Sequence, residues 1–589
     1  MIYTIVNSFA IWTDAQGIKS RTRINSVDNI SLEGIARLRE LILDLAVSGK
    51  LVPQDPNEEP AYKLLKKIEL EKQILIKERK LTLQKKQLPI SDKEKPFKLS
   101  QSWEWVRLTD IGNIFNGNSI DATTKETKYT NNKGIPYIAT KDVGYGWNML
   151  DYDNGISIPE GEMNFKLAHK GSVLICAEGG SAGKKCGITN KDIYFGNKLF
   201  AIELFGNIPS KYILSNYLSS IFSRQFKSKL TGIIGGISIQ KFIDIVIPLP
   251  PLAEQHRIVA KVDELIALCD KLEEEQFNNL KTHQVLVKTL LETLTQAVDA
   301  NGLQTAWERI YEYFDILFCT EDSIEQLKQT ILQLAVMGKL VKQDPNDESA
   351  SELIKKIAKE KERLAKEGII KKITPLPKIA ESEKPFELPN GWQFCRLDEL
   401  CSIITKGSSP KWQGVSYTEN PNDILFVTSE NVGSYKLLLE SKKYVELKFN
   451  EIEPKSILQK GDFLMNIVGG SIGRTAIYNI GDLANINQAV CLIRMLPEFI
   501  NPQFFLHFFN SSICVSYMFD KQVDNARANL SMGNISKFVM PFPSLAEQNR
   551  IVEKIESLFL ICDSIKDKLV KAQELKVLLS KTIIEKAVE

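Results

Sequence analysis

Residues 31–50 place apolar side chains three or four positions apart, among them Leu38 and Leu45. This spacing predicts a helix with one apolar face. Gly49 comes soon after the last apolar position and is a suitable end for the helix, because glycine readily adopts the left-handed conformation found there. The following residues, 61–86, are mostly charged with a thin apolar stripe, which predicts a second helix.

Two longer apolar stripes follow proline-rich segments, within residues 253–283 and 546–576. Their apolar positions alternate at spacings of three and four, which is typical of the seam of a coiled coil. We expect the two helices to pair seam to seam, with Ile258, Val262, Leu265 and Cys269 facing Ile551, Ile555, Leu558 and Cys562. The alternative is that each helix packs separately on its own domain.

Residues 96–250 and 386–543 have a different character. Short alternating apolar runs are separated there by Gly, Asn and Ser, which favour turns. This pattern predicts small mixed α/β domains with long loops, and therefore an α+β protein in which long helices separate two such domains.

The chain repeats itself. Residues 45–57 (LAVSGKLVPQDPN) and 334–346 (LAVMGKLVKQDPN) are identical at eleven of thirteen positions, and LAEQHRIV at 252–259 returns as LAEQNRIV at 545–552. Repeats this far apart indicate two tandem half-chains related by pseudo-twofold symmetry. We expect five regions: helical 1–95, mixed 96–250, helical 251–385, mixed 386–543 and a final helix 544–589.

Charge says little about partners. The formal net charge is +2, so no overall positive field indicates a nucleic-acid partner. The nine cysteines contain no Cys-x-x-Cys pair, which favours buried thiols in a reducing compartment. The N-terminus lacks a signal-peptide pattern, and no run of about 18 apolar residues could span a membrane. We therefore expect a cytoplasmic protein with no membrane partner.

The sequence contains no recognisable set of catalytic residues. The four histidines, His169, His256, His283 and His507, lack the spacing of metal ligands, so no metal site is predicted. Residues 179–184 resemble a phosphate-binding loop, but Glu178 stands where that motif needs glycine and Lys185 where it needs Ser or Thr. Asn501-Pro502-Gln503-Phe504 resembles a methyltransferase tetrapeptide with a wrong third residue, and is better explained as a helix start.

Both mixed blocks contain two glycine-bearing loops with Lys or Arg nearby. Small residues allow close approach to another surface, and the cations could contact phosphate or guanine; the alternative is a tight turn with a solvated charge. Because both loops occur in both copies, we favour binding. The candidate DNA-binding residues are Asn116, Gly117, Asn118, Lys125, Lys128, Gly180, Ser181, Lys184, Lys185, Lys406, Gly407, Ser408, Lys411, Gly470, Ser471 and Arg474.

Taken together, the LAEQ-x-RIV and LAV-x-GKLV-x-QDPN motifs, the KPFELPNGW segment and the GG-S-x-G loop resemble the specificity subunit of type I restriction–modification systems. The resemblance implies two target-recognition domains held apart by two long antiparallel helices, each recognising half of a bipartite double-stranded DNA sequence. It also implies a non-catalytic subunit that docks two modification subunits and joins two restriction subunits. S-adenosylmethionine, ATP and Mg would then be used by those other subunits, with no cofactor on this chain.

Two other functions remain open from the residues alone. The chain could be a two-domain protein-binding adaptor that uses its helix pair as a rigid strut. It could also be a self-contained methyltransferase, which the missing cofactor motifs disfavour.

Overall fold

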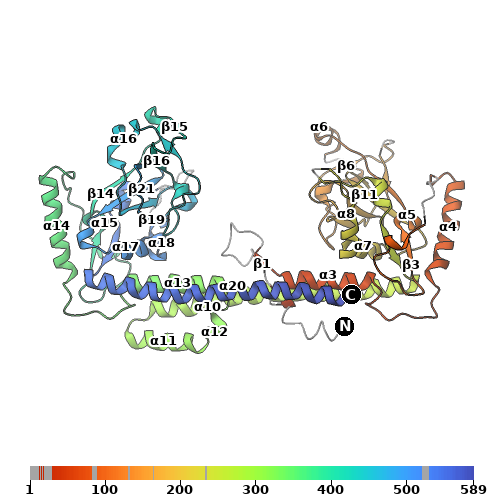
Figure 1. Ribbon diagram of the computed structural model, residues 1–589, viewed down its shortest axis with the longest axis horizontal. Helices are drawn as coiled ribbons and strands as arrows, with labels where there is room; N and C mark the ends of the chain where they lie inside the picture. The colour runs from red at the N-terminus through yellow and green to blue at the C-terminus, as the bar shows by residue number, and fades with distance from the viewer. Residues whose placement is uncertain are drawn as a thin grey trace. The chain divides into compact units, whose positions relative to one another are not determined.

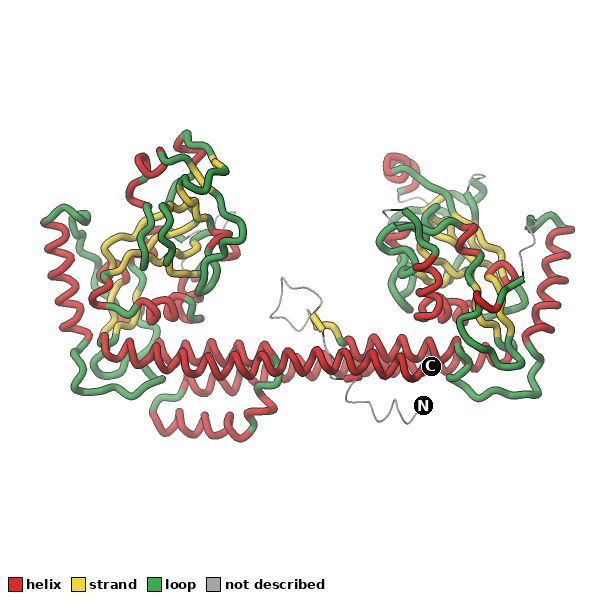
Figure 2. Tube along the Cα trace, in the orientation of Figure 1, coloured by secondary structure: helices red, strands yellow, loops and turns green. Residues whose placement is uncertain are grey.

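The computed structural model describes residues 12–13, 15, 17–18, 30–82, 89–130, 133–162, 165–232, 235–520 and 530–588. The chain forms two compact units. Unit 1 comprises Met1–Leu280 and Ala572–Glu589, and unit 2 comprises Lys281–Lys571. Figure 1 labels the elements of each unit, and Figure 2 separates helices from strands.

Unit 1 contains a helical part and a mixed part. The helix predicted within 31–50 is α3 (Glu33–Val47), and Gly49 has the expected positive φ of 73°. The charged helix is α4 (Ala61–Lys77), which is shorter than predicted; residues 83–86 of that prediction lie outside the described residues. The long helix α10 (Leu252–Gln296) begins in this unit, and α20 (Leu545–Val588) ends in it. A short pair, β1 (Gly17–Ile18) and β2 (Ile30–Ser31), precedes α3.

The mixed part of unit 1 holds two four-stranded sheets with short helices packed beside them. The first sheet has the order β6 (Ser157–Ile158), β5 (Ile135–Ile138), β10 (Ile193–Phe195), β7 (Leu167–Ala168). The second has the order β4 (Gly112–Asn116), β11 (Leu199–Leu204), β8 (Val173–Cys176), β9 (Cys186–Ile188). The helices are α5 (Leu108–Ile111), α6 (Ala122–Thr124), α7 (Ser210–Leu218), α8 (Ser220–Ser228) and α9 (Ile239–Ile243).

Unit 2 also has two four-stranded sheets, and one of them matches the second sheet of unit 1 in strand order. One sheet has the order β15 (Tyr417–Thr418), β17 (Tyr444–Val445), β16 (Ile424–Val427), β20 (Ala484–Ile486). The other has the order β14 (Cys401–Lys406), β21 (Val490–Met495), β18 (Asp462–Asn466), β19 (Thr475–Tyr478). Among the described residues, each half has one parallel pair of strands, β5 with β10 and β16 with β20; the pair lies in the middle of its sheet in unit 1 and at the edge of its sheet in unit 2. The predicted α+β fold with an internal repeat is confirmed.

Most helices of unit 2 also follow unit 1; unit 2 adds one helix between β17 and β18 and one pair of helices. The helices of this unit include α13 (Glu321–Val336), α14 (Ala350–Lys366), α15 (Leu397–Leu400), α16 (Lys448–Ile452), α17 (Pro502–Phe509), α18 (Ser512–Asp520) and α19 (Met532–Ser536). The added pair precedes α13 and consists of α11 (Ala300–Glu312) and α12 (Phe314–Leu317). Asn501, in the tetrapeptide considered above, caps α17 by accepting from the Gln503 amide at 2.9 Å, as expected for a helix start.

Each mixed part is entered and left through one antiparallel ribbon. In unit 1, β3 (Glu104–Arg107) pairs with β12 (Val246–Leu249); in unit 2, β13 (Gln393–Arg396) pairs with β22 (Val539–Phe542). The first strand comes just after the prolines of the entry linker, and the second comes just before the long helix. The two ends of the mixed part therefore lie side by side on the helical part.

The predicted seam between the two long helices is wrong in its register. Ile258, Val262 and Cys269 belong to the core of unit 1, where they share a cluster with α3. Ile551 and Cys562 belong to the core of unit 2, where they share a cluster with α13 and the end of α10. The helices run antiparallel, so the beginning of one accompanies the end of the other, and the two similar stripes fall in different units.

The two repeated motifs hold each other in both halves. Arg257 of the LAEQ-x-RIV motif forms an ion pair with Glu58, just after the QDPN segment, and Arg550 does the same with Asp347 at 2.6 Å. The buried Glu254 accepts a hydrogen bond from the Trp103 indole at 2.9 Å. The shared residues therefore form a framework that fixes the long helix to the start of the mixed part.

Candidate nucleic-acid interface

The first glycine loop begins where β4 ends. A Cβ atom on Gly117 would lie 1.9 Å from the carbonyl oxygen of Phe195, and one on Gly407 would lie 1.8 Å from that of Ile486. No side chain can be accommodated at such distances. These two glycines are therefore required by the close packing of the loop against β10 or β20, which is sufficient to explain them without a ligand.

Two asparagines beside Gly117 are also engaged in the fold. Lys166 donates from its ammonium to Asn116 Oδ1 at 3.1 Å and from its backbone amide to Asn118 Oδ1 at 2.9 Å. The Asn118 amide donates to Phe195 O at 2.8 Å. These contacts fix the loop and leave the NH2 groups of both side chains available for an acceptor.

The ammonium groups of the two lysines after this loop have different interaction partners. Lys128 is paired with Glu162, and this hydrogen bond raises the pKa of its ammonium. The Lys125 ammonium lies 5.2 Å from the ring centroid of Tyr137, a cation–π contact that leaves the charge uncompensated by a carboxylate. Lys125 is therefore the better candidate for a phosphate contact.

The second glycine loop connects β8 to β9, and its counterpart connects β18 to β19. Gly179 and Gly469 have φ of 80° and 74°, so the turn itself requires glycine there. Gly180 and Gly470 have no atom within 4 Å of a built Cβ, in contrast to Gly117. The fold therefore does not need glycine at these two positions, and an external surface could approach closely.

The cations of this loop divide into exposed and inward-held side chains. Lys184 and Arg474 are exposed. Lys184 donates only to Gly180 O of its own loop, at 3.0 Å, and Arg474 makes no side-chain hydrogen bond or ion pair within the described residues. Lys185 instead donates to Thr140 O at 3.1 Å, so it positions the loop.

The structure brings the two loops of unit 1 together at the end of β5. Tyr137, on that strand, donates its hydroxyl to Asn118 O of the first loop at 2.8 Å. Lys185 of the second loop bonds to Thr140, two residues beyond the strand. In unit 2, Asn466 at the end of β18 donates to Ser429 O, just beyond β16, at 2.9 Å. Each half thus places both loops around the same strand end.

Sequence reasoning missed Tyr145. Its hydroxyl lies 3.4 Å from Ser181 Oγ, its ring centroid lies 5.3 Å from the Lys185 ammonium, and 55% of the residue is exposed. A signal was present, because Val-Gly-Tyr at 143–145 returns as Val-Gly-Ser-Tyr at 432–435. Tyr435, however, is mostly buried against His507, and burial raises the pKa of its hydroxyl.

The first loop of unit 2 is more open than its counterpart. Lys406 and Lys411 are exposed, and Trp412 is 76% exposed. Ser408 is held within the loop, since its hydroxyl accepts from Gln413 Nε2 at 2.9 Å. An exposed indole beside two cations is suited to stacking on a base or sugar.

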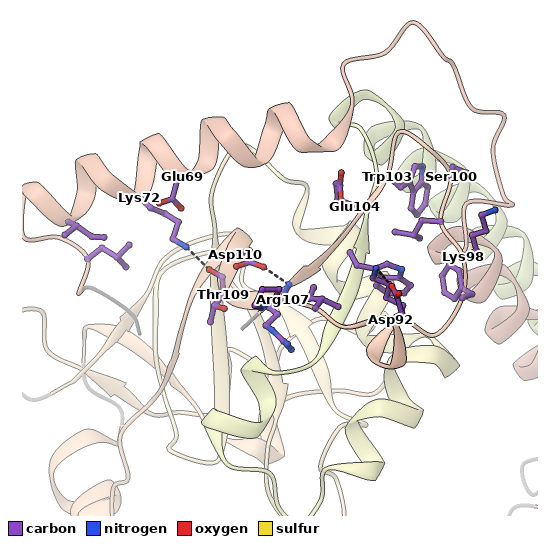
Figure 3. A pocket seen from close by; sticks show the side chains of 18 of the residues that line it. Glu69, Lys72, Asp92, Lys98, Ser100, Trp103, Glu104, Arg107, Thr109 and Asp110 are labelled. Carbon is purple, nitrogen blue, oxygen red and sulfur yellow. Dashed lines mark hydrogen bonds and ion pairs between the residues drawn. The ribbon is translucent and has the colours of Figure 1, made fainter. Parts of the chain in front are cut away.

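A hollow of about 1430 Å³ lies elsewhere in unit 1, between α4 and β3 (Figure 3). Lys72 donates to Thr109 O at 3.0 Å, and Arg107 forms an ion pair with Glu94 at 2.8 Å. The counterparts in unit 2, Lys361 to Asp398 O and Arg396 to Glu383, form the same contacts. These cations therefore hold the shared framework together and are not free for a ligand.

Two further properties concern the described residues. No group of three or more His, Cys, Asp or Glu side chains among them could hold a metal ion. In this part of the chain, every helix is too short or too polar for a membrane crossing.

Comparison with known proteins gives the family. The model of the type I restriction modification DNA specificity domain matches residues 100–282 and 389–574. The chain belongs to the specificity subunits of type I restriction–modification systems. It is 36% identical to the EcoAI specificity subunit and 34% identical to the EcoEI specificity subunit, both of Escherichia coli, over 99% of each chain.

A solved chain from work on complex assembly and conformational transition of the type I R-M system is also similar. It covers 84% of this specificity subunit and 99% of its own length, at 17% identity and a TM-score of 0.46.

Proposed function

We propose that this specificity subunit selects the DNA target of a type I restriction–modification complex, and that residues 96–250 and 386–543 are its two target-recognition domains. Each domain would recognise one half of a bipartite double-stranded sequence. The observation that carries this proposal is that the two halves share one four-stranded sheet order and the same entry ribbon but expose different side chains at equivalent loops.

The loops supply the difference that two half-sites need. Unit 1 exposes Tyr145 and Lys184 at the second loop, whereas unit 2 buries Tyr435 and exposes Arg474. Arginine can donate two parallel hydrogen bonds to guanine, and a lysine acts as a single charged donor. The same framework would thus present two distinct recognition surfaces.

We further propose that the shared helical segments 31–90, 251–295 and 320–375 dock two modification subunits or form the spacer between the recognition domains. Support comes from apolar side chains that are exposed on these helices, including Leu70 at 60% on α4 and Leu268 at 56% on α10. Such residues favour a protein partner. The chain itself would be non-catalytic, with S-adenosylmethionine bound by the modification subunits and ATP and Mg used with two restriction subunits.

Exchanging residues 96–250 for the equivalent block of a relative tests the two-domain proposal. The methylated sequence should change in one half-site and stay the same in the other, as measured by methylome sequencing of cells that carry the complex. A change in both halves would contradict separate recognition domains.

Labelled S-adenosylmethionine tests the division of labour. The purified chain should transfer no methyl group to DNA, and the complex with modification subunits should methylate it. Methyl transfer by the chain alone, free of the modification subunit, would contradict a non-catalytic role.

A further inference from the structure

A basic groove of about 970 Å³ lies in unit 1, beside the second glycine loop. It is formed by α3, α8, the entry linker around Lys98, the loop containing Gly146 and Trp147, and the end of α20. Seven of its lining residues are Lys or Arg, and two are Asp or Glu. The groove is therefore much more basic than the chain as a whole.

The two acidic residues of the groove are both satisfied within the fold. Asp44, on α3, is buried and accepts from the Ser220 amide at 2.8 Å and from its hydroxyl at 2.6 Å, which fixes the start of α8 to α3. Glu40 forms an ion pair with Arg37 at 2.8 Å. Asp44 also interacts electrostatically with Arg224, and Arg39 is paired with Asp270 and Glu273 on α10, but neither Lys98 nor Lys227 has a carboxylate partner among the described residues.

Three of the cations are available to a ligand. Lys98, Arg224 and Lys227 are exposed, and their side chains form no hydrogen bond or ion pair among the described residues. Arg224 and Lys227 are three positions apart on α8, so they lie on one face of that helix.

The groove is continuous with the second glycine loop. Gly146 and Trp147 line it, and the preceding residue, Tyr145, forms a β-bridge with Lys185. On the other side, a Cβ on Gly183 would lie 2.5 Å from the Phe226 ring, so the loop rests directly on α8. A ligand that contacts Lys184 could therefore continue along α8 into the groove.

The helix of unit 2 that corresponds to α8 lacks these cations. Its α18 holds the place of α8, because a Cβ on Gly473 would lie 3.2 Å from Val515 of that helix. The α18 sequence, SICVSYMFD, contains no Lys or Arg, and Ser516 and Phe519 stand where α8 has Arg224 and Lys227. Among the described residues, the pair of cations on this helix is thus found in the first half alone.

We infer that this groove binds the sugar–phosphate backbone of DNA beside the half-site held by the first recognition domain. The inference rests on the proposed function. A row of unpaired cations on one face, next to the candidate recognition loop, fits a polyanion that continues past the bases being recognised. DNA binding by this subunit is then electrostatically asymmetric, with more phosphate contacts on the side of unit 1.

The test is a double variant, Arg224→Gln with Lys227→Gln, in the complex with its modification subunits. Binding of a target duplex and of an unrelated duplex is measured between 50 and 200 mM salt. Loss of two phosphate contacts lowers the salt slope by about 1.8, so over this range the wild type loses about twelvefold more affinity than the variant. The loss of affinity is similar for the target and the unrelated duplex, because contacts to the sugar–phosphate backbone do not depend on the base sequence.

The matched control is Lys568→Gln with Lys571→Gln, which removes two exposed lysines at the same spacing on α20 and leaves the salt slope unchanged. A second variant, Lys98→Gln, lowers the slope by about one and does not alter α8.

The outcomes separate the inference from the proposed function. If both groove variants keep the salt slope of the wild type, the inference is overturned. DNA binding by the wild-type complex would still support the proposed function. A loss confined to the target duplex assigns the residues to base contacts and also overturns it. Reduced recovery of modification subunits assigns the groove to a protein partner. A wild-type complex that binds neither duplex overturns the proposed function itself.

Discussion

Replacing Gly117 by alanine should destabilise unit 1, although this glycine belongs to a loop that could equally have been assigned to DNA. The new Cβ would lie 1.9 Å from Phe195 O and 2.5 Å from the carbonyl carbon. The loop and β10 must separate by roughly 1 Å or more to relieve this overlap. That movement also breaks the 2.8 Å hydrogen bond from the Asn118 amide to Phe195 O.

The expected size follows from these two losses. Overpacking of this kind costs about 1–3 kcal/mol, and a backbone hydrogen bond contributes about 1 kcal/mol. A total of about 2–4 kcal/mol lowers the melting temperature of a domain of this size by roughly 4–16 °C. Thermal unfolding of the full-length chain, followed by circular dichroism, measures this shift.

The control is Gly180→Ala, because no atom lies within 4 Å of a Cβ built there and its φ is not in the left-handed region. That variant should melt with the wild type. Weaker DNA binding by the complex that contains this variant would show that DNA approaches the backbone closely at Gly180. Equal melting temperatures for the two variants would refute the steric argument for Gly117.

Other expectations concern single side chains. Burial lowers the pKa of His507 to about 4, so unit 2 should lose roughly 3 kcal/mol as pH falls from about 6.5 to 4, and urea titrations of His507→Phe should lack this loss. Burial raises the pKa of Glu254, so its carboxyl group favours folding at low pH and loses that effect as pH rises through the raised value. Glu254→Gln should therefore gain stability relative to the wild type between pH 4 and 7, as measured in the same way. Lys184→Ala and Arg474→Ala should each weaken DNA binding by the complex in filter-binding assays; a phosphate role lowers the salt slope by about one, and a base role relaxes one position by about 1–3 kcal/mol.

Each of these expectations has a contradicting result. An unaltered acid dependence in His507→Phe would assign the loss to other groups. A stability difference that is independent of pH would show that Glu254 does not titrate as a buried carboxyl. Unchanged affinity of both loop variants would return Lys184 and Arg474 to a structural role.

The repeats, the first helices and the mixed character of the two blocks were predictable because each depends on local spacing or on identity between segments. The register of the two long helices was not. The stripe of Ile258 and the stripe of Ile551 look alike, and local periodicity carries no information about which way two distant helices run. Because the two long helices run in opposite directions, their apolar stripes meet different partners, and each stripe packs in the core of its own unit.

The loops show a similar limit. Gly117 and Gly180 look equivalent in the sequence, yet one faces a carbonyl oxygen and the other faces open space. Lys128 was a candidate until Glu162, 34 positions away, proved to be its partner. A residue's neighbours across the fold determine whether it is free for a ligand, and those neighbours are set by tertiary structure.

The ribbons that begin and end each mixed part have a genetic consequence. Because β3 pairs with β12, and β13 with β22, both ends of a variable block are joined to framework that the repeated motifs hold together. Crossovers within the near-identical motif sequences would replace a block whole and keep pairs such as Arg550 and Asp347 intact. The stretches of the gene most prone to homologous crossover are thus those where the fold best tolerates a junction, so gene shuffling can generate folded variants with new target sequences.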